Sequence, residues 1–353
     1  MDRSRVAKGA AAGHGPTISG HSGESNDARG SPLRLAARPF FMSKKMKVLI
    51  AYDGSESGAA PLSDLPRAGL PDEVEALVYV ADVWLPSSRA EFARATDSRR
   101  QLAAGLSSFA PALRAVEEER ALTREAGRRF RSAFPTWEVS VEASPGCGLP
   151  TSELIRKAVS WTADLIVVGS KSRQDDEGAG LGHSFLKVVD EAACSVRISR
   201  PAPVTDKTSV RLIVGVDGSP GSESAVNTIG SRQWPAGSEC LVVTPWRHME
   251  ALARETADAL RATGLNTLTR VSEGDPLRVL SGEAREWGAD CIFVGPNRRG
   301  TETEHRDSNN AVTSLVACAP CSVEVARKRL WETACAFIPL ARVADDLAAV
   351  GAG

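Results

Sequence analysis

The sequence lacks the segments and motifs that several classes of protein require. It has no run of about 18 apolar residues, so no transmembrane helix and no membrane partner are expected. It has no HExxH motif, no paired cysteine clusters and no GxSxG motif, which argues against a zinc protease, a structural zinc site and an α/β-hydrolase. Of its five histidines, none lies beside an obvious nucleophile. These absences favour a binding protein over an enzyme.

The chain also has little net charge, and that charge is unevenly distributed. The formal net charge is −1, but residues 1–47 contain nine Lys or Arg and only three Asp or Glu. The remaining residues therefore carry a net charge of −7. Because binding to nucleic acid needs a basic surface, this mildly acidic body argues against a nucleic-acid partner.

The seven cysteines show no framework for disulfide bonds. Their number is odd, and most of them lie in apolar segments. This pattern is typical of reduced, buried thiols and predicts a cytoplasmic protein. Cys318 and Cys321 form a single CxxC motif, which we interpret as a packing feature because Cys321 opens an apolar segment and no second pair of ligands is present.

Three segments of the chain occur twice, in the same order. Residues 47–55 (KVLIAYDGS) return as 211–219 (RLIVGVDGS), and residues 164–169 (DLIVVG) return as 290–295 (DCIFVG). Residues 194–198 (CSVRI) return as 321–325 (CSVEV). Three matched segments in one order indicate a duplicated domain. We name residues 46–203 repeat 1 and residues 209–327 repeat 2.

Apolar strands alternate with helical segments in both repeats, which predicts an α/β fold of the Rossmann-like type. Strands without polar alternation are buried on both faces, so each repeat is expected to form a five-stranded, mostly parallel sheet with helices on both faces. The strands are expected near residues 48–52, 74–84, 137–141, 165–168 and 195–199 in repeat 1, and 212–216, 239–244, 267–271, 291–294 and 322–326 in repeat 2.

The two ends of the chain differ from the repeats. Residues 1–45 are rich in Gly, Ser, Ala and Arg without sustained periodicity, so we expect a disordered basic tail. Residues 328–353 contain an apolar stripe at helical spacing, which predicts a C-terminal helical tail lying on the body.

A candidate binding site follows from the positions of two residues at strand ends. Asp53 ends the first strand and Gly169 ends the fourth. Ligands of open α/β sheets bind beyond the carboxyl ends of the strands. A polar, Gly-rich loop at residues 170–184 leads directly into a helix, and backbone N–H groups of the loop and of the helix N-terminus could hold phosphate oxygens. The alternative interpretation is an ordinary surface loop.

This set of motifs resembles the universal stress protein (UspA) family, whose fold is adenine nucleotide alpha hydrolase-like. The resemblance rests on Asp-Gly-Ser after the first strand, Val-Val-Gly-Ser after the fourth and Cys-Ser-Val after the last helix, and it covers about residues 46–200 and 210–327. It implies ATP, with Mg²⁺, as the ligand. It also implies that the repeats pack against each other through their last strands as an intramolecular pseudo-dimer; a homodimer of whole chains and unknown protein partners remain open.

The resemblance also implies binding residues in repeat 1. ATP-binding members have the loop pattern Gly, two residues, Gly, nine residues, Gly, then Ser or Thr. Aligned on this pattern, together with the first-strand aspartate and an apolar adenine contact, the implied site is Asp53, Val80, Gly169, Ser172, Gly182, His183 and Ser184. Ser172 replaces one glycine, and His183 takes the place of the hydroxyl residue.

Repeat 2 departs further from the same pattern. Only Asp217 and Gly295 are retained, and Thr244 replaces the apolar contact. The resulting hypothesis is a cytosolic stress-response binding and signalling module in which repeat 1 binds ATP weakly and repeat 2 is degenerate. Two alternatives remain open: a ligand-free interaction scaffold and a slow ATP hydrolase.

Overall fold

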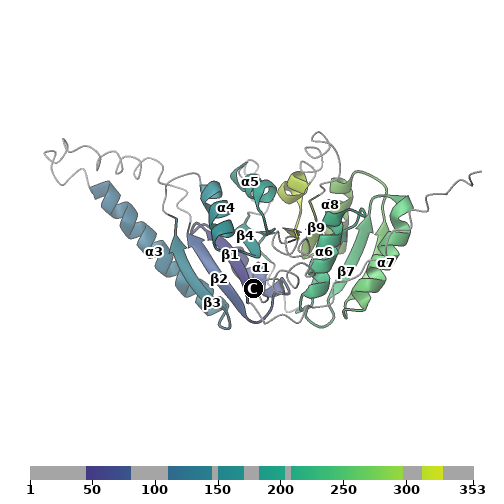
Figure 1. Ribbon diagram of the computed structural model, residues 1–353, viewed down its shortest axis with the longest axis horizontal. Helices are drawn as coiled ribbons and strands as arrows, with labels where there is room; N and C mark the ends of the chain where they lie inside the picture. Colours follow the sequence, from purple (N-terminus) through teal and green to yellow (C-terminus); the bar gives the residue numbers. More distant parts are fainter. Residues whose placement is uncertain are drawn as a thin grey trace, which may run out of the picture. The chain divides into compact units, whose positions relative to one another are not determined.

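The computed structural model describes residues 45–80, 110–144, 150–170, 183–202, 208–296 and 312–328. All of these residues belong to one compact unit, residues 33–353. They form a ten-stranded sheet with the order β3-β2-β1-β4-β5-β10-β9-β6-β7-β8 (Figure 1). Read from each outer edge inward, both repeats have the order third, second, first, fourth, fifth strand, so the duplication in sequence is a duplication in topology.

Each repeat supplies five strands and the helices between them. Repeat 1 contains β1 (Met46–Tyr52), α1 (Pro61–Asp64), η1 (Leu65–Arg67), β2 (Val74–Val80), α3 (Ala110–Ala133), β3 (Glu138–Ala143), α4 (Pro150–Ser160), β4 (Leu165–Gly169), α5 (His183–Glu191) and β5 (Ser195–Ser199). Repeat 2 contains β6 (Arg211–Gly215), α6 (Pro220–Ser231), β7 (Glu239–Thr244), η3 (Arg247–Met249), α7 (Glu250–Arg261), β8 (Asn266–Val271), α8 (Pro276–Trp287), β9 (Cys291–Val294), helical residues 312–318 and β10 (Ser322–Val325).

The strands pair in parallel except at the centre of the sheet. There β5 and β10 run antiparallel, with Val323 opposite Ile198 and Val325 opposite Val196. The expected mostly parallel α/β fold and the expected pairing of the last strands are confirmed. The expectation of two five-stranded sheets needs correction, because this backbone pairing joins them into one sheet. It also covers an edge that each repeat would otherwise expose.

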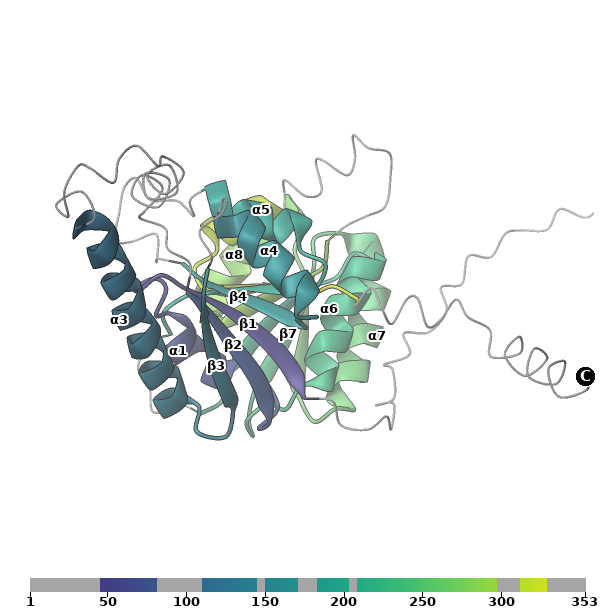
Figure 2. The ribbon, with the colours of Figure 1, turned by 60° about the vertical axis from the view of Figure 1, so that its left-hand side comes forward.

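The helices pack on both faces of the sheet and bury three apolar clusters. On one face a single cluster runs across both repeats, beneath α4, α5, α8 and helical residues 312–318. On the other face repeat 1 has its own cluster beneath α1, η1 and α3, and repeat 2 has one beneath α6 and α7. Figure 2 shows α4, α5 and α8 together on one side of the sheet. The repeats therefore share one core layer as well as one sheet.

The helical segment after β1 is shorter than the sequence predicts. Periodicity predicts a helix over residues 56–67, but the structure has turns up to residue 60, then α1 and η1. Pro66 lacks an N–H group, which disfavours continuation of an α-helix. In repeat 2 the corresponding α6 is continuous for 12 residues.

Each repeat contains the same cluster of a cation, a tryptophan and an aspartate. In repeat 1, Lys47 Nζ lies 5.1 Å from the centre of the Trp161 ring, and the Lys47 N–H donates to Asp164 Oδ2 at 2.8 Å. In repeat 2, Arg211, Trp287 and Asp290 repeat this arrangement, with distances of 5.6 and 2.8 Å. The two tryptophans occupy equivalent places just before the fourth strand of each repeat, which predicts packing between helix and sheet. Both are partly buried against the shared core cluster, as this prediction requires.

The cysteines in the described residues are free, and four of them are buried. Burial raises the pKa of Cys194 to about 11 and the pKa values of Cys240 and Cys321 to about 12. Since the thiolate is the reactive form, we expect Cys240 and Cys321 to resist alkylation at pH 8 in the native protein and to react fully in urea. Partly exposed Cys318 is the internal control. Peptide mass spectrometry after iodoacetamide treatment tests this, and native labelling of Cys321 at the rate of Cys318 would contradict it.

Candidate functional site

The carboxyl end of β1 carries a tight polar turn. Asp53 Oδ1 accepts hydrogen bonds from the backbone N–H of Ser55 at 2.9 Å and from its hydroxyl at 2.6 Å. The Ser55 hydroxyl in turn accepts the N–H of Gly58 at 3.0 Å, so Ser55 caps the turn that follows. The sequence predicts Ser55 as the N-cap of a helix that begins at residue 56, but α1 begins at Pro61 and its N-cap is Ala60. Gly54 has a φ of 77°, a conformation that glycine adopts without strain.

Repeat 2 has the same turn at the carboxyl end of β6. Asp217 Oδ1 accepts the N–H of Ser219 at 2.9 Å, and Gly218 has a φ of 70°. The Ser219 side chain accepts the N–H of Ser222, which makes it the N-cap of α6. The two aspartates therefore occupy equivalent, partly exposed positions, and the repeats offer matched sites for experiment.

The glycines that end β4 and β9 lie where two backbone segments touch. A Cβ atom on Gly169 would lie 1.8 Å from the carbonyl oxygen of Ser57, and one on Gly295 would lie 1.9 Å from that of Gly221. No side chain fits at such distances. The sequence suggests a phosphate-binding role for Gly169, and the structure adds a packing role: it lets the turn after β1 lie against the end of β4.

The structure brings together only some of the expected binding residues of repeat 1. Asp53, Val80 and Gly169 lie at or beside the carboxyl ends of the adjacent strands β1, β2 and β4, where the strand order switches direction. Ser172 and Gly182 lie outside the described residues. His183 and Ser184 form the first turn of α5, and their side chains also lie outside the described part of the chain.

A pocket of about 320 Å³ lies at the equivalent switch point of repeat 2. It is bounded by the carboxyl ends of β6 and β9, by the Pro245–Trp246 pair after β7 and by α8. Its described lining includes one carboxylate, Asp217, and contains no Lys or Arg. The apolar lining side chains are Val216, Pro245, Trp246, Pro276, Leu277, Leu280, Val294, Val312 and Leu315. An apolar pocket with few polar groups suits an uncharged ligand better than a triphosphate.

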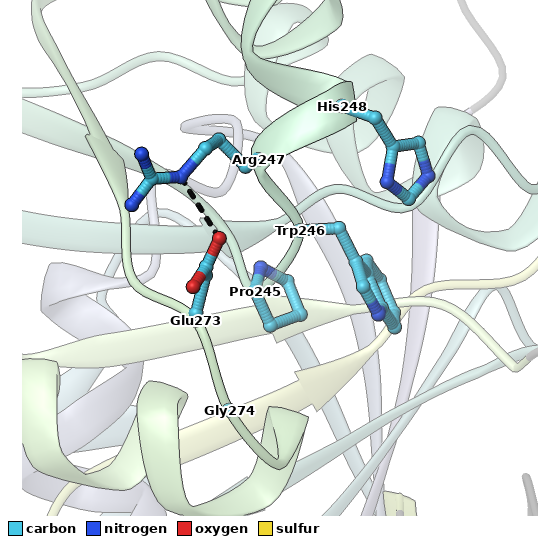
Figure 3. A pocket seen from close by; sticks show the side chains of 6 residues that line it. All are labelled: Pro245, Trp246, Arg247, His248, Glu273 and Gly274. Atoms are coloured by element: carbon cyan, nitrogen blue, oxygen red, sulfur yellow. Dashed lines mark hydrogen bonds and ion pairs between the residues drawn. The ribbon is translucent and has the colours of Figure 1, made fainter.

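Trp246 is the lining residue that sequence reasoning missed. Its side chain is 37% exposed, and the Pro-Trp pair directly after a buried strand was the available signal. Its backbone N–H lies 3.4 Å from the hydroxyl of Thr244, which is fully buried where an apolar contact was expected. Trp246 also borders a larger and more open hollow, of about 680 Å³. There the exposed ion pair of Arg247 and Glu273, 2.8 Å long, lies apart from Trp246 and His248 (Figure 3).

Solved structures of other proteins have a fold similar to this one. A universal stress protein from Archaeoglobus fulgidus DSM 4304 matches 80% of this chain and 98% of its own, with a TM-score of 0.57 and 18% sequence identity. The chain has the universal stress protein fold. Because 80% of this chain is more than either repeat contains, the match includes residues of both repeats.

Other structures with this fold match less closely. A putative universal stress protein from Pseudomonas aeruginosa UCBPP-PA14 matches 80% of this chain and 93% of its own, with a TM-score of 0.48 and 14% identity. A universal stress protein family protein from Arabidopsis thaliana, with AMP bound, matches 44% of this chain and 92% of its own, with a TM-score of 0.26 and 17% identity. No protein-family model and no curated protein matches the chain.

In the described residues, no group of three or more His, Cys, Asp or Glu side chains is placed to hold a metal ion. No helix among them has the length and apolar character needed to cross a bilayer.

Proposed function

We propose that this chain is a tandem universal stress protein, a cytosolic binding and signalling module whose repeat 1 binds an adenine nucleotide. The observation that carries the proposal is the polar turn at Asp53, which lies beside Gly169 at the switch point of the strand order. Open α/β sheets bind ligands at this position, and the N-terminus of the following helix favours phosphate. Mg²⁺ would accompany the nucleotide, with Asp53 as a carboxylate at the carboxyl end of β1.

Repeat 2 supports a division of roles between the two halves. It retains the aspartate and the glycine, but the described lining of its pocket combines a carboxylate with apolar side chains and no cation. Repeat 2 also lacks the other two glycines of the loop pattern, and Thr244 replaces the apolar adenine contact. We therefore assign ATP binding to repeat 1 alone.

The matched turns allow a controlled test in the full-length protein. Calorimetric titration with ATP and Mg²⁺ is expected to show one site, which Asp53→Ala weakens at least about 10-fold, the scale expected for a lost hydrogen bond to a charged group. Asp217→Ala removes the same kind of turn contact from repeat 2 and is expected to leave ATP affinity unchanged.

Each other outcome points to a different function. No binding at millimolar ATP would make the protein a ligand-free scaffold. Loss of affinity in Asp217→Ala, with affinity retained in Asp53→Ala, would place the nucleotide in repeat 2. Phosphate release by the wild-type protein that disappears in Asp53→Ala would identify a slow hydrolase instead of a binding module.

The apolar pocket of repeat 2 favours a second candidate function, the binding of a small uncharged aromatic molecule. Adenosine is a suitable probe because it carries no phosphate. We expect Trp246→Ala to weaken adenosine binding at least about 5-fold, as one aromatic contact contributes about 1 kcal/mol, while Asp53→Ala leaves that binding intact. Trp246 is exposed enough for its truncation to spare the fold. Adenosine binding that Asp53→Ala removes would contradict a separate site in repeat 2.

A further inference from the structure

The interface between the repeats, where β5 pairs with β10, contains a buried ion pair at its centre. Arg197 of β5 and Glu324 of β10 lie directly opposite each other in the antiparallel pairing. Their side chains are 1% and 0% exposed, and Arg197 Nη1 donates to Glu324 Oε2 at 3.1 Å. A charge in such a place costs free energy unless it is paired and hydrogen-bonded, so the identity of its partner matters.

Two further charged side chains contact this ion pair, one at each end. Asp64 accepts from Arg197 Nε and Nη2, both at 2.7 Å, and also from the hydroxyls of Ser199 and Ser322. Arg232 donates to Glu324 Oε2 at 2.9 Å and makes a second, shorter contact to Oε1. Along the line from Asp64 to Arg232 the signs alternate: negative, positive, negative, positive.

The duplication places Arg197 and Glu324 at equivalent positions. The segment Cys194–Ile198 matches Cys321–Val325, so Arg197 is the fourth residue of one copy and Glu324 the fourth residue of the other. Because the register pairs these two residues with each other, the approximate twofold axis that relates the repeats passes through them. A residue on such an axis meets its own equivalent in the partner.

Pairing of either repeat with a second copy of itself would put like charges on this axis. Two copies of repeat 1 would bring Arg197 against Arg197, with the order negative, positive, positive, negative. Two copies of repeat 2 would bring Glu324 against Glu324. Like charges in contact are strongly unfavourable where water is excluded.

The other paired residues of the two strands cannot distinguish the repeats, and Ser199, whose equivalent is Ala326, donates its hydroxyl to Asp64 of its own repeat. Ser195 and Ser322 are identical, as are Val196 and Val323, and Ile198 is matched by the similar Val325. Apolar and hydroxyl contacts would form almost equally well in all three pairings. Within the paired segments, Arg197 and Glu324 on the axis therefore distinguish the correct pairing from the two same-repeat pairings.

We propose that the axial Arg197–Glu324 pair makes the two repeats specific partners, so that the last strand of each accepts the other and rejects a copy of itself. The exposed edge of β5 is therefore covered by β10 of the other repeat, and that of β10 by β5. Specificity of this kind combines an attractive contact in the correct pairing with a repulsive contact in the wrong ones.

Cleavage of the folded full-length chain tests the proposal. A protease site inserted between Ala202 and Thr208 separates the repeats after folding, and isotope-labelled and unlabelled cleaved protein are then mixed and examined by native mass spectrometry. We expect one-to-one complexes of repeat 1 with repeat 2, with same-repeat dimers below about 1% of the complexes, as a discrimination of roughly 100-fold requires. Same-repeat dimers in comparable amount, or repeats that separate without any association, would overturn the proposal.

A neutral axial residue provides the matched control. Glu324→Gln keeps the size and an acceptor oxygen for the two arginines but removes the negative charge. Cleaved Glu324→Gln protein is expected to show at least about 10-fold more dimer of repeat 2 than the wild type, while dimers of repeat 1 stay rare because Arg197 is unchanged. An unchanged fraction of repeat 2 dimer would show that the charge does not discriminate. The wild-type result stands alone if this variant folds poorly.

Discussion

Replacing Gly169 or Gly295 with alanine is expected to destabilise the protein by about 3 kcal/mol or more. The added methyl group would lie within 2 Å of a backbone carbonyl oxygen in either case. A flexible side chain could move away, but here the strand end and the following turn would both have to shift. The free energy of unfolding from urea titrations, with the slope checked for two-state behaviour, measures the effect.

A third glycine provides the control, because its replacement shows the general effect of alanine without a close backbone contact. Gly282 lies within α8, and a Cβ atom there would meet nothing within 4 Å. Gly282→Ala is therefore expected to be neutral or to stabilise the protein by up to about 1 kcal/mol through helix propensity. If Gly169→Ala and Gly282→Ala had the same stability, the close backbone approach would be unimportant.

Removal of the Asp64 carboxylate is expected to cost about 3–5 kcal/mol of stability. Asp64→Ala would deprive buried Arg197 of two hydrogen bonds at 2.7 Å and leave the hydroxyls of Ser199 and Ser322 without their acceptor. Burial opposes the charge on Arg197, but the carboxylates of Asp64 and Glu324 keep its pKa well above the usual value. Because a guanidinium does not lose its proton in proteins, the arginine would stay charged and poorly compensated in the variant. Urea unfolding again measures the loss.

An exposed pair of the same chemical type is the control. Asp258 pairs with Arg261 on α7, where the two side chains are 73% and 49% exposed. Asp258→Ala is expected to change stability by less than about 1 kcal/mol, because water screens exposed pairs. A similar loss in both variants would mean that burial does not set the cost at Asp64.

The repeated segments were sufficient to predict most of the fold. Short apolar strands between helical segments carry a strong local signal, so the strands were placed to within a few residues where the structure describes them. The helix predicted over residues 56–67 was too long, because residues 56–60 form turns and only α1 and η1 are helical. The domain boundaries, the N-terminal tail and the C-terminal tail remain predictions, since the comparisons do not test them and both tails lie outside the described residues.

The candidate site was predicted in part. Asp53, Val80 and Gly169 come together because the carboxyl ends of neighbouring parallel strands share one edge of the sheet. The roles of Ser172, Gly182, His183 and Ser184 remain predictions. The pocket of repeat 2 was missed because Leu280, Leu315 and Trp246 are far apart in the sequence, and only the packing of α8 and helical residues 312–318 over β6 brings them together.

The sequence by itself determined the duplication, the alternation of strands and helices, and the polar turns at Asp53 and Asp217, because these depend on residues close together in the chain. Only the tertiary structure decided how the repeats join. Arg197 and Glu324 each interrupt an apolar strand, and that interruption has no local explanation in the sequence. Their pairing depends on a register between strands more than 120 residues apart, which is set when the whole sheet assembles. Whether a buried charge is stable depends on such distant partners, whereas the periodicity of a strand depends on residues close together in the chain.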